Sequence, residues 1–195
     1  MTAPVRGMMA TPQQILDFWF GAPGTPGHGE FREVWFKQNP EFDAEIRRRF
    51  LHAYEQAAAG ACDGWCESPE GCLALVLLLD QVPRNLFRGD PRAWATDPKA
   101  RAVARQALER GHDRDLSPHG RAFLYMPFMH SEDPADQRRS LALFEALGLP
   151  ASLEAARRHL EIVERFGRFP HRNAVLGRAT TPEEAAFLQE PNSSF

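Results

Sequence analysis

The sequence predicts a single, almost wholly α-helical domain of about eight helices, and three observations support this fold class. First, at seven places where a helix is expected to begin, a residue that favours the N-cap position stands directly before proline. Second, apolar residues recur at helical spacing after these places. Third, no alternating apolar and polar run is bounded by turn sequences, as β-hairpins require. The domain is expected to span residues 1–195, with its core at about 11–190 and flexible ends at 1–10 and 191–195.

The seven cap-plus-proline pairs predict where helices begin. Proline at the first position of a helix loses no hydrogen bond, because the N–H of that position has no acceptor within the helix. The preceding side chain accepts a bond from another N–H of the first turn. The pairs are Thr11-Pro12, Asn39-Pro40, Ser68-Pro69, Asp97-Pro98, Ser117-Pro118, Asp133-Pro134 and Thr181-Pro182. Thr181 and Glu184 also fit a capping box.

Apolar stripes and glycines then outline the helices in chain order. The stripe after Pro40 consists of Phe42, Ile46, Phe50, Ala53 and Ala57, and Gly60 offers a stop. Residues 73–79 are apolar on all sides, so the helix after Pro69 is expected to be buried and to end near Val82, before Pro83. The stripes that follow Pro98, Pro134 and Leu153 are expected to stop at Gly111, Gly148 and Gly167. The stretch 21–29 is rich in Gly and Pro and is expected to be an exposed loop.

Charge and composition argue against several classes of protein. The net charge is −3, without the basic stripe that a broad grip on nucleic acid requires, so no nucleic-acid partner is expected. The longest apolar run, 72–79, is far shorter than the roughly 20 residues of a spanning helix, so no membrane partner is expected either. No signal peptide is recognisable at the N-terminus. The sparse cysteines Cys62, Cys66 and Cys72 are expected to be reduced thiols, and the predicted location is cytoplasmic.

Three polar stretches interrupt the helical pattern, at residues 80–89, 125–133 and 166–173. Each contains a proline that no cap residue precedes, namely Pro83, Pro127 or Pro170, and each proline is expected to end or kink a helix. The candidate acid–base groups are Asp80, His130, Glu132 and His171. The candidate ligand-binding residues are Arg84, Asn85, Arg88, Arg168, Arg172 and Asn173, because arginine forks match the paired oxygens of carboxylate or phosphate.

Structural roles for the same residues stay open. Asp80 and Arg84 can form a buried ion pair that only fastens a helix joint, and His130 and Glu132 are as easily structural as functional. The histidines His52, His112, His119 and His159 are interpreted as ordinary structural residues. His130, Glu132 and His171 resemble a two-His-one-carboxylate metal site, but the nearby arginines oppose a divalent cation. We therefore predict neither a metal nor a cofactor.

Four blocks of this sequence resemble a known family. They are ILDFWFG at 15–21, LDQVPRN at 79–85, PFMHSE at 127–132 and the stretch 166–173, and together they look like the hallmarks of bacterial domain-of-unknown-function family 924. The resemblance extends from about residue 11 to residue 189. It departs mildly at Val82, where the family usually has Phe, and at Thr180, where it usually has Ser. The resemblance implies an all-α, tetratricopeptide-like arrangement of helical hairpins and no established activity.

Two functional hypotheses follow. In the first, the three polar stretches converge on a pocket that binds a small anionic molecule bearing phosphate or carboxylate, with acid–base catalysis as a further step. In the second, a tetratricopeptide-like module binds a peptide or protein partner in a groove that includes Trp19, Trp35 and Phe36. The first hypothesis requires His130 and His171 to face the same pocket although they are distant in sequence, and the second requires a long groove.

Overall fold

The computed structural model describes residues 9–194, and this part of the chain is all-α without a β-strand. The all-α part of the predicted fold class is therefore confirmed. The helices are α1 (Pro12–Phe20), α2 (Pro40–Ala58), α3 (Pro69–Val76), α4 (Val82–Leu86), α5 (Asp97–Glu109), α6 (Pro118–Met129), α7 (Pro134–Leu147), α8 (Pro150–Phe166) and α9 (Pro182–Phe187). Short 3₁₀ turns connect several of them, including Glu33–Trp35, Pro91–Trp94 and Pro170–Arg172. Most of the expected flexible N-terminus, residues 1–8, lies outside the described residues.

Six of the seven predicted caps are confirmed. The side chains of Thr11, Asn39, Ser68, Ser117, Asp133 and Thr181 each accept a hydrogen bond from a backbone N–H in the first turn of the following helix. The prediction was wrong for Asp97, since Thr96 is the N-cap residue and Asp97 is the first residue of α5. The Asp97 carboxylate binds Arg84 instead of the helix N-terminus. An ion pair thus replaces the cap at this one site.

The predicted stop at Pro83 is also wrong, because the buried helix continues to Leu86. A turn of π-helix, Leu77–Gln81, joins α3 to α4, and the N–H of Val82 bonds to the carbonyl of Leu77, five residues earlier. This wider turn accommodates the proline ring, which in a regular α-helix would clash with the carbonyl four residues earlier. That carbonyl, of Leu79, accepts a hydrogen bond of 2.6 Å from the Thr96 hydroxyl.

Pro127 does not end its helix either. It lies inside α6, which runs on to Met129, and His130 caps the helix end. The proline is in the last turn of α6, so few backbone hydrogen bonds remain to be formed after it. The expected stops at Gly148 and Gly167 are confirmed, since both glycines follow their helices with positive φ values of 74° and 69°.

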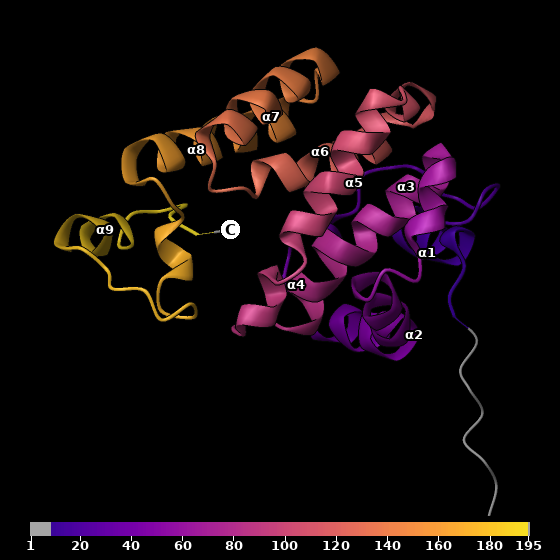
Figure 1. Ribbon diagram of the computed structural model, residues 1–195, viewed down its shortest axis with the longest axis horizontal. Coiled ribbons are helices and arrows are strands. Elements are labelled where there is room, and N and C mark those ends of the chain that lie inside the picture. The colour runs from indigo at the N-terminus through magenta and orange to yellow at the C-terminus, as the bar shows by residue number, and fades with distance from the viewer. Residues whose placement is uncertain (1–8, 195) are drawn as a thin grey trace, which may run out of the picture.

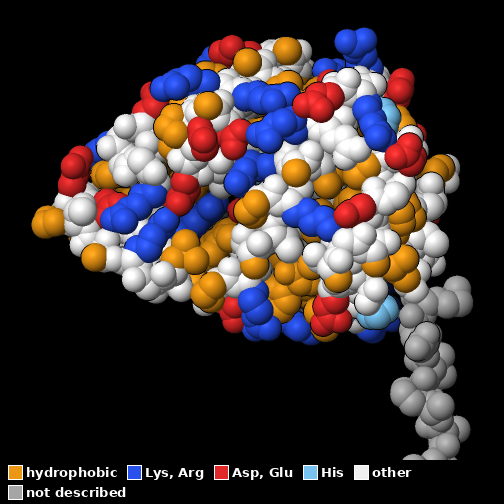
Figure 2. Space-filling view, viewed as in Figure 1, with side chains coloured by type: hydrophobic (Ala, Val, Ile, Leu, Met, Phe, Trp, Pro, Cys, Tyr) orange, Lys and Arg blue, Asp and Glu red, His pale blue; other side chains and the backbone are white. Residues whose placement is uncertain are grey.

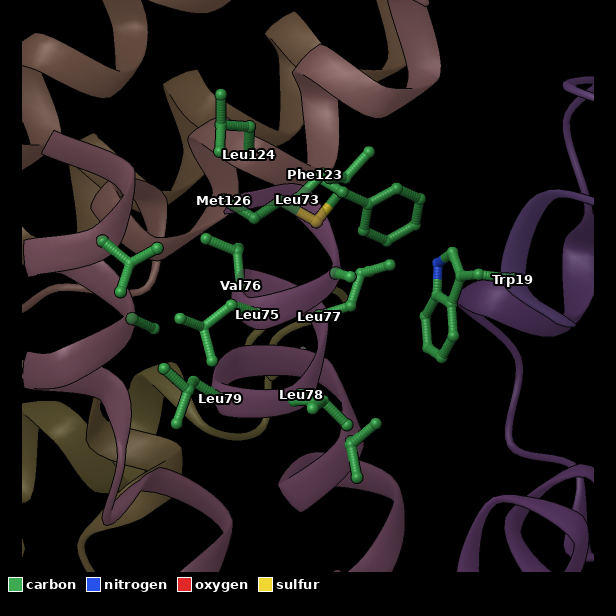
Figure 3. Close-up of a cluster of buried hydrophobic side chains, with 14 of the residues drawn as sticks. Trp19, Leu73, Leu75, Val76, Leu77, Leu78, Leu79, Phe123, Leu124 and Met126 are labelled. Atoms are coloured by element: carbon green, nitrogen blue, oxygen red, sulfur yellow. The ribbon is translucent and has the colours of Figure 1, made fainter. Parts of the chain in front are cut away.

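Helix α6 lies between two groups of helices (Figure 1). The group α1 to α5 occupies one side, and α7, α8 and α9 occupy the other, with α6 packed against α3, α5, α7 and α8. The largest hydrophobic cluster surrounds α3 and the π turn, where Leu75, Val76, Leu77, Leu78 and Leu79 are wholly buried (Figure 3). A smaller cluster of Ile162, Val163, Phe169 and Phe187 holds α9 against α8. No described helix has the length and apolar character needed to cross a membrane.

Candidate functional site

A cavity of about 730 Å³ opens beside α6 and is lined by six parts of the chain. One wall is a face of α6 and another is the beginning of α8. The π turn with α4 and the segment 31–37 form two further sides, and the 3₁₀ turns Pro91–Trp94 and Pro170–Arg172 contribute the rest. Its polar lining consists of Lys37, Gln81, Arg84, Asn85, Arg88, His119, His130, Ser152, His159, His171 and Arg172. His130 and His171 therefore share one cavity, as the first hypothesis requires.

At one side of the cavity, Asp80 holds His130. Asp80 is wholly buried, and its Oδ1 lies 2.8 Å from Nδ1 of His130. Its other oxygen accepts a hydrogen bond from the Gln81 amide. Because a carboxylate only accepts hydrogen bonds, this contact places the proton of the neutral imidazole on Nδ1 and leaves the lone pair on Nε2. The π turn is what brings Asp80 and Gln81 to this position from the end of the apolar helix.

Arg84 keeps Asp80 ionised. Its guanidinium lies 3.3 Å from Asp80 and makes two parallel bonds to Asp97, of 2.8 and 2.9 Å. Burial alone would raise the pKa of Asp80, but the charge of Arg84 and the hydrogen bond from His130 outweigh burial and lower it. Burial lowers the pKa of His130, and Arg84 lowers it further against the opposing effect of Asp80. At neutral pH the pair is thus a carboxylate and a neutral imidazole.

Arg172 lies on the same network. Its guanidinium donates to the carbonyl of His130 at 3.1 Å and stacks over the rings of Trp94 and Phe169, with its central carbon 5.3 and 4.6 Å from the ring centres. Asp97 is 4.0 Å away. Burial, and then the charge of Arg84, lower the pKa of Arg172 to about 10, so it remains a cation at neutral pH. Its Nε has no hydrogen-bond partner among the described residues.

Two further imidazoles line the cavity near His130. The ring of His159 is 6.1 Å from that of His130, and its Nδ1 lies 2.7 Å from the carbonyl of Ala155, which again leaves the lone pair on Nε2. Burial lowers the pKa of His159 to about 3, and burial together with Arg172 lowers that of His171 to about 4. The three histidines are therefore neutral at pH 7, and each neutral ring has one nitrogen that can accept a hydrogen bond.

Several predicted residues lie elsewhere or have structural partners. Glu132 binds Arg178 through two bonds of 2.7 and 2.9 Å and accepts the N–H of Phe169. Arg168 binds Glu184, and Asn173 also donates to Glu184. None of these three predicted residues lines the cavity. They fasten the segment 168–184 to α9 and to the α6–α7 joint, which is the structural role that the sequence left open.

Asn85 and Arg88 line the cavity but share a partner outside its lining. The Asn85 amide donates to Asp43 at 2.7 Å, and Arg88 forms two bonds of 2.7 and 3.0 Å to the same carboxylate. Asp43 belongs to α2, so these bonds also tie α4 to α2. The Arg88 side chain nevertheless remains 40% exposed, which leaves it accessible to a solute in the cavity.

Sequence reasoning missed Asp97, Trp94 and His159. Asp97 was interpreted as a helix cap because it precedes a proline, and Trp94 carried no distinguishing pattern. His159 had a detectable signal, since it lies three residues after Ala156 and four before Val163 on the apolar stripe of α8. A histidine in such a stripe is buried and needs a polar partner or a cavity.

The described residues include no group of three or more His, Cys, Asp or Glu side chains placed to hold a metal ion. Glu132, the carboxylate of the metal triad considered above, is instead paired with Arg178. The cysteines Cys62, Cys66 and Cys72 are unbridged and buried, away from the cavity lining.

Comparison with known proteins places the chain in a family without assigning its chemistry. No curated protein matches it. A solved structure, the protein of unknown function ATU0120 from Agrobacterium tumefaciens, is 47% identical, with a TM-score of 0.84 over 91% of this chain and 96% of that one. A family model described as "Bacterial protein of unknown function (DUF924)" matches residues 15–192, nearly the whole sequence. The chain therefore belongs to this bacterial family, as its four sequence blocks predicted.

Proposed function

We propose that the cavity binds a small anionic molecule that bears a carboxylate or phosphate group. The observation that carries this proposal is the charge of the lining: Lys37, Arg84, Arg88 and Arg172 face the cavity, and no Asp or Glu of the described chain lines it. Asp80 and Asp97 lie behind the arginines and are engaged by them. The basic groups are thus nearer to a bound solute than the acidic ones, which favours an anion. The outer surface differs, since basic and acidic side chains mix on the face in Figure 2.

Acid–base catalysis is the second part of the proposal. His130 would act through Nε2 as a general base, because Asp80 holds its proton on Nδ1 and the imidazole is neutral at pH 7. Asp80 would be a positioning residue, since it is wholly buried behind His130. Arg172, which lines the cavity and donates to the carbonyl of His130, would hold the anionic group beside this base.

Thermal unfolding with inorganic phosphate as the probe tests the binding step. Phosphate is expected to raise the melting temperature along a saturable curve, more than sodium chloride does at equal ionic strength. Arg172→Gln is expected to abolish the saturable part while leaving the general salting-out effect of phosphate in place. Arg48→Gln is the matched control, because Arg48 is exposed, pairs with Glu45 and does not line the cavity.

A second variant guards against misfolding of Arg172→Gln. Arg88→Gln changes a half-exposed side chain of the cavity and is expected to shift the phosphate curve to higher concentration. A native protein without a saturable response would contradict the proposed function, and so would two cavity variants that respond as Arg48→Gln does.

We also infer a tetratricopeptide-like pairing of helices, supported by the packing of α7 against both α6 and α8. This arrangement keeps the peptide-binding hypothesis as the second candidate. Of the three aromatic residues that this hypothesis assigns to a groove, however, Trp19 is 1% and Trp35 7% exposed. Phe36 alone of the three offers a large accessible surface. A binding site for a peptide would therefore centre on Phe36 and the cavity mouth.

A further inference from the structure

Helix α6 sets the length of the cavity. His119, Phe123, Met126 and His130 all line it, and they follow one face of the helix. Because an α-helix rises about 1.5 Å per residue, His119 and His130 lie roughly 16 Å apart along the axis, and Phe123 and His130 roughly 10 Å apart. The cavity is therefore elongated, and its two ends can be compared by their chemistry.

The end near His119 is aromatic. Phe36 stacks on Phe123 with ring centres 6.1 Å apart and planes within 5°, and Trp35 packs edge-on against Phe123 at 5.1 Å. Phe31 stacks on Phe36 at 6.0 Å. Phe31 and Phe36 are 57% and 58% exposed, although both line the cavity. Large exposed aromatic rings at a cavity mouth are costly in water and gain free energy when an apolar group covers them.

The end near His130 is polar and basic. It contains His130, His159, His171 and Arg172. The rings of His159 and His171 contact Phe169, and Arg172 stacks over Trp94 and Phe169 with Asp97 4.0 Å away. Between the two ends, α6 presents the apolar side chains of Met126 and Met129. Methionine is flexible and fits irregular apolar ligands. The His119 end is thus the more aromatic and the His130 end the more polar, although Lys37 lines the cavity beside Phe36 and the Gln81 amide donates to the sulfur of Met126.

We propose that the natural ligand is an amphipathic anion, with a carboxylate or phosphate group at the Arg172 end and an apolar body about 10 Å long that reaches Phe123 and Phe36. This inference rests on the proposed anion-binding function and specifies its ligand class. The exposed aromatic rings at one end and Arg172 beside His130 at the other support an elongated ligand with one charged end. A small, wholly polar anion would leave the exposed rings of Phe31 and Phe36 uncovered.

Calorimetric titration of the full chain with straight-chain carboxylates tests the ligand class. The probes are acetate, butanoate, hexanoate and octanoate, with inorganic phosphate as the reference anion. Affinity is expected to rise with chain length, by up to about fourfold for each methylene that becomes fully buried. The double variant Phe31→Ser/Phe36→Ser is expected to lose most of this rise while binding acetate and phosphate as the native protein does.

Leu176→Ser is the matched control, because Leu176 is an apolar residue of 38% exposure that does not line the cavity, and it is expected to retain the full rise. If acetate and phosphate bind but affinity does not depend on chain length, the amphipathic ligand class is wrong and the proposed anion site stands. If no carboxylate and no phosphate binds, both proposals fail. An equal loss of the chain-length effect in Leu176→Ser and in the double variant would also overturn the inference, since the effect would then not arise at Phe31 and Phe36.

Discussion

The chemistry of His130 depends on a carboxylate that never reaches the cavity. Asp80 is wholly buried between Arg84, Gln81 and His130, so it fixes the imidazole without meeting a ligand. A buried charge of this kind is stable only while its partners remain, because desolvation of an unpaired ion costs several kcal/mol. The site and the stability of the fold therefore share this residue.

Replacing Asp80 with Asn should consequently be costly. The substitution leaves Arg84 with less compensation in a buried setting, and the free energy of unfolding in urea should fall by about 3–5 kcal/mol. Asp90→Asn, which alters an exposed pair with Arg92, should change the free energy of unfolding far less. A loss of similar size in both variants would show that Asp80 is not a buried structural charge.

Residue types and local breaks in the helix pattern predicted about half of the cavity's polar lining. Asp80, Arg84, His130, His171 and Arg172 were candidates and lie together in or behind the lining. Glu132, Arg168 and Asn173 carried the same sequence signal but bind Arg178 and Glu184. An arginine beside a helix joint can bind a ligand or can form an ion pair that holds the joint together. Which role it has depends on its neighbours in space.

Among the helices, two Asp-Pro pairs with the same sequence signal have different roles. The carboxylate of Asp133 accepts the N–H of Ala135 at 2.7 Å and caps α7. The carboxylate of Asp97 binds Arg84 through two bonds and leaves the cap position to Thr96. The difference arises because α5 begins beside the buried network, whereas α7 begins at the surface.

Alanine substitutions at Asp133 and Asp97 should distinguish the capping role from the ion-pair role. Asp133→Ala removes one cap and should lower the free energy of unfolding by about 1 kcal/mol. Asp97→Ala leaves a guanidinium without its paired acceptor and should lower it by about 3–5 kcal/mol. Chemical denaturation of both variants gives the comparison, and equal losses would mean that the Arg84–Asp97 pair adds nothing beyond a cap.

Helix starts were predictable because N-capping is a local property of two or three neighbouring residues. The continuation through Pro83 was not, because it depends on a π turn and on the Thr96 hydroxyl, which reaches the Leu79 carbonyl from 17 residues away. Local helix propensity reflects the presence of the proline, but it does not reflect a hydrogen-bond donor that is distant in the sequence. This element is also the one that places Asp80, Gln81 and Arg84 at the site.

For the molecule as a whole, the cavity brings together segments from residue 31 to residue 172, so it exists only in the folded chain. Its histidines couple folding to pH. Folding lowers the pKa of His159 to about 3 and of His171 to about 4, whereas an unfolded chain has histidine pKa values of about 6.5. Below pH 6.5 the unfolded state therefore binds protons that the folded state does not.

Stability should accordingly fall as the pH drops from 6.5 toward 5 and level off above about 7. Each such histidine contributes up to about 1.4 kcal/mol per pH unit to the slope of the unfolding free energy. In urea titrations over this range, His171→Asn should reduce the slope, and His52→Asn, at an exposed position, should not. An unchanged slope in His171→Asn would contradict the neutral state assigned to His171 in the folded protein.

The most direct test of the central claim is a crystal structure of the protein at saturating octanoate. The carboxylate should lie within hydrogen-bond distance of the Arg172 guanidinium, beside His130, and the alkyl chain should run along Met126 toward Phe123. Octanoate bound only outside the cavity, or a cavity that stays without octanoate at saturation, would contradict the claim that this cavity is an anion-binding site.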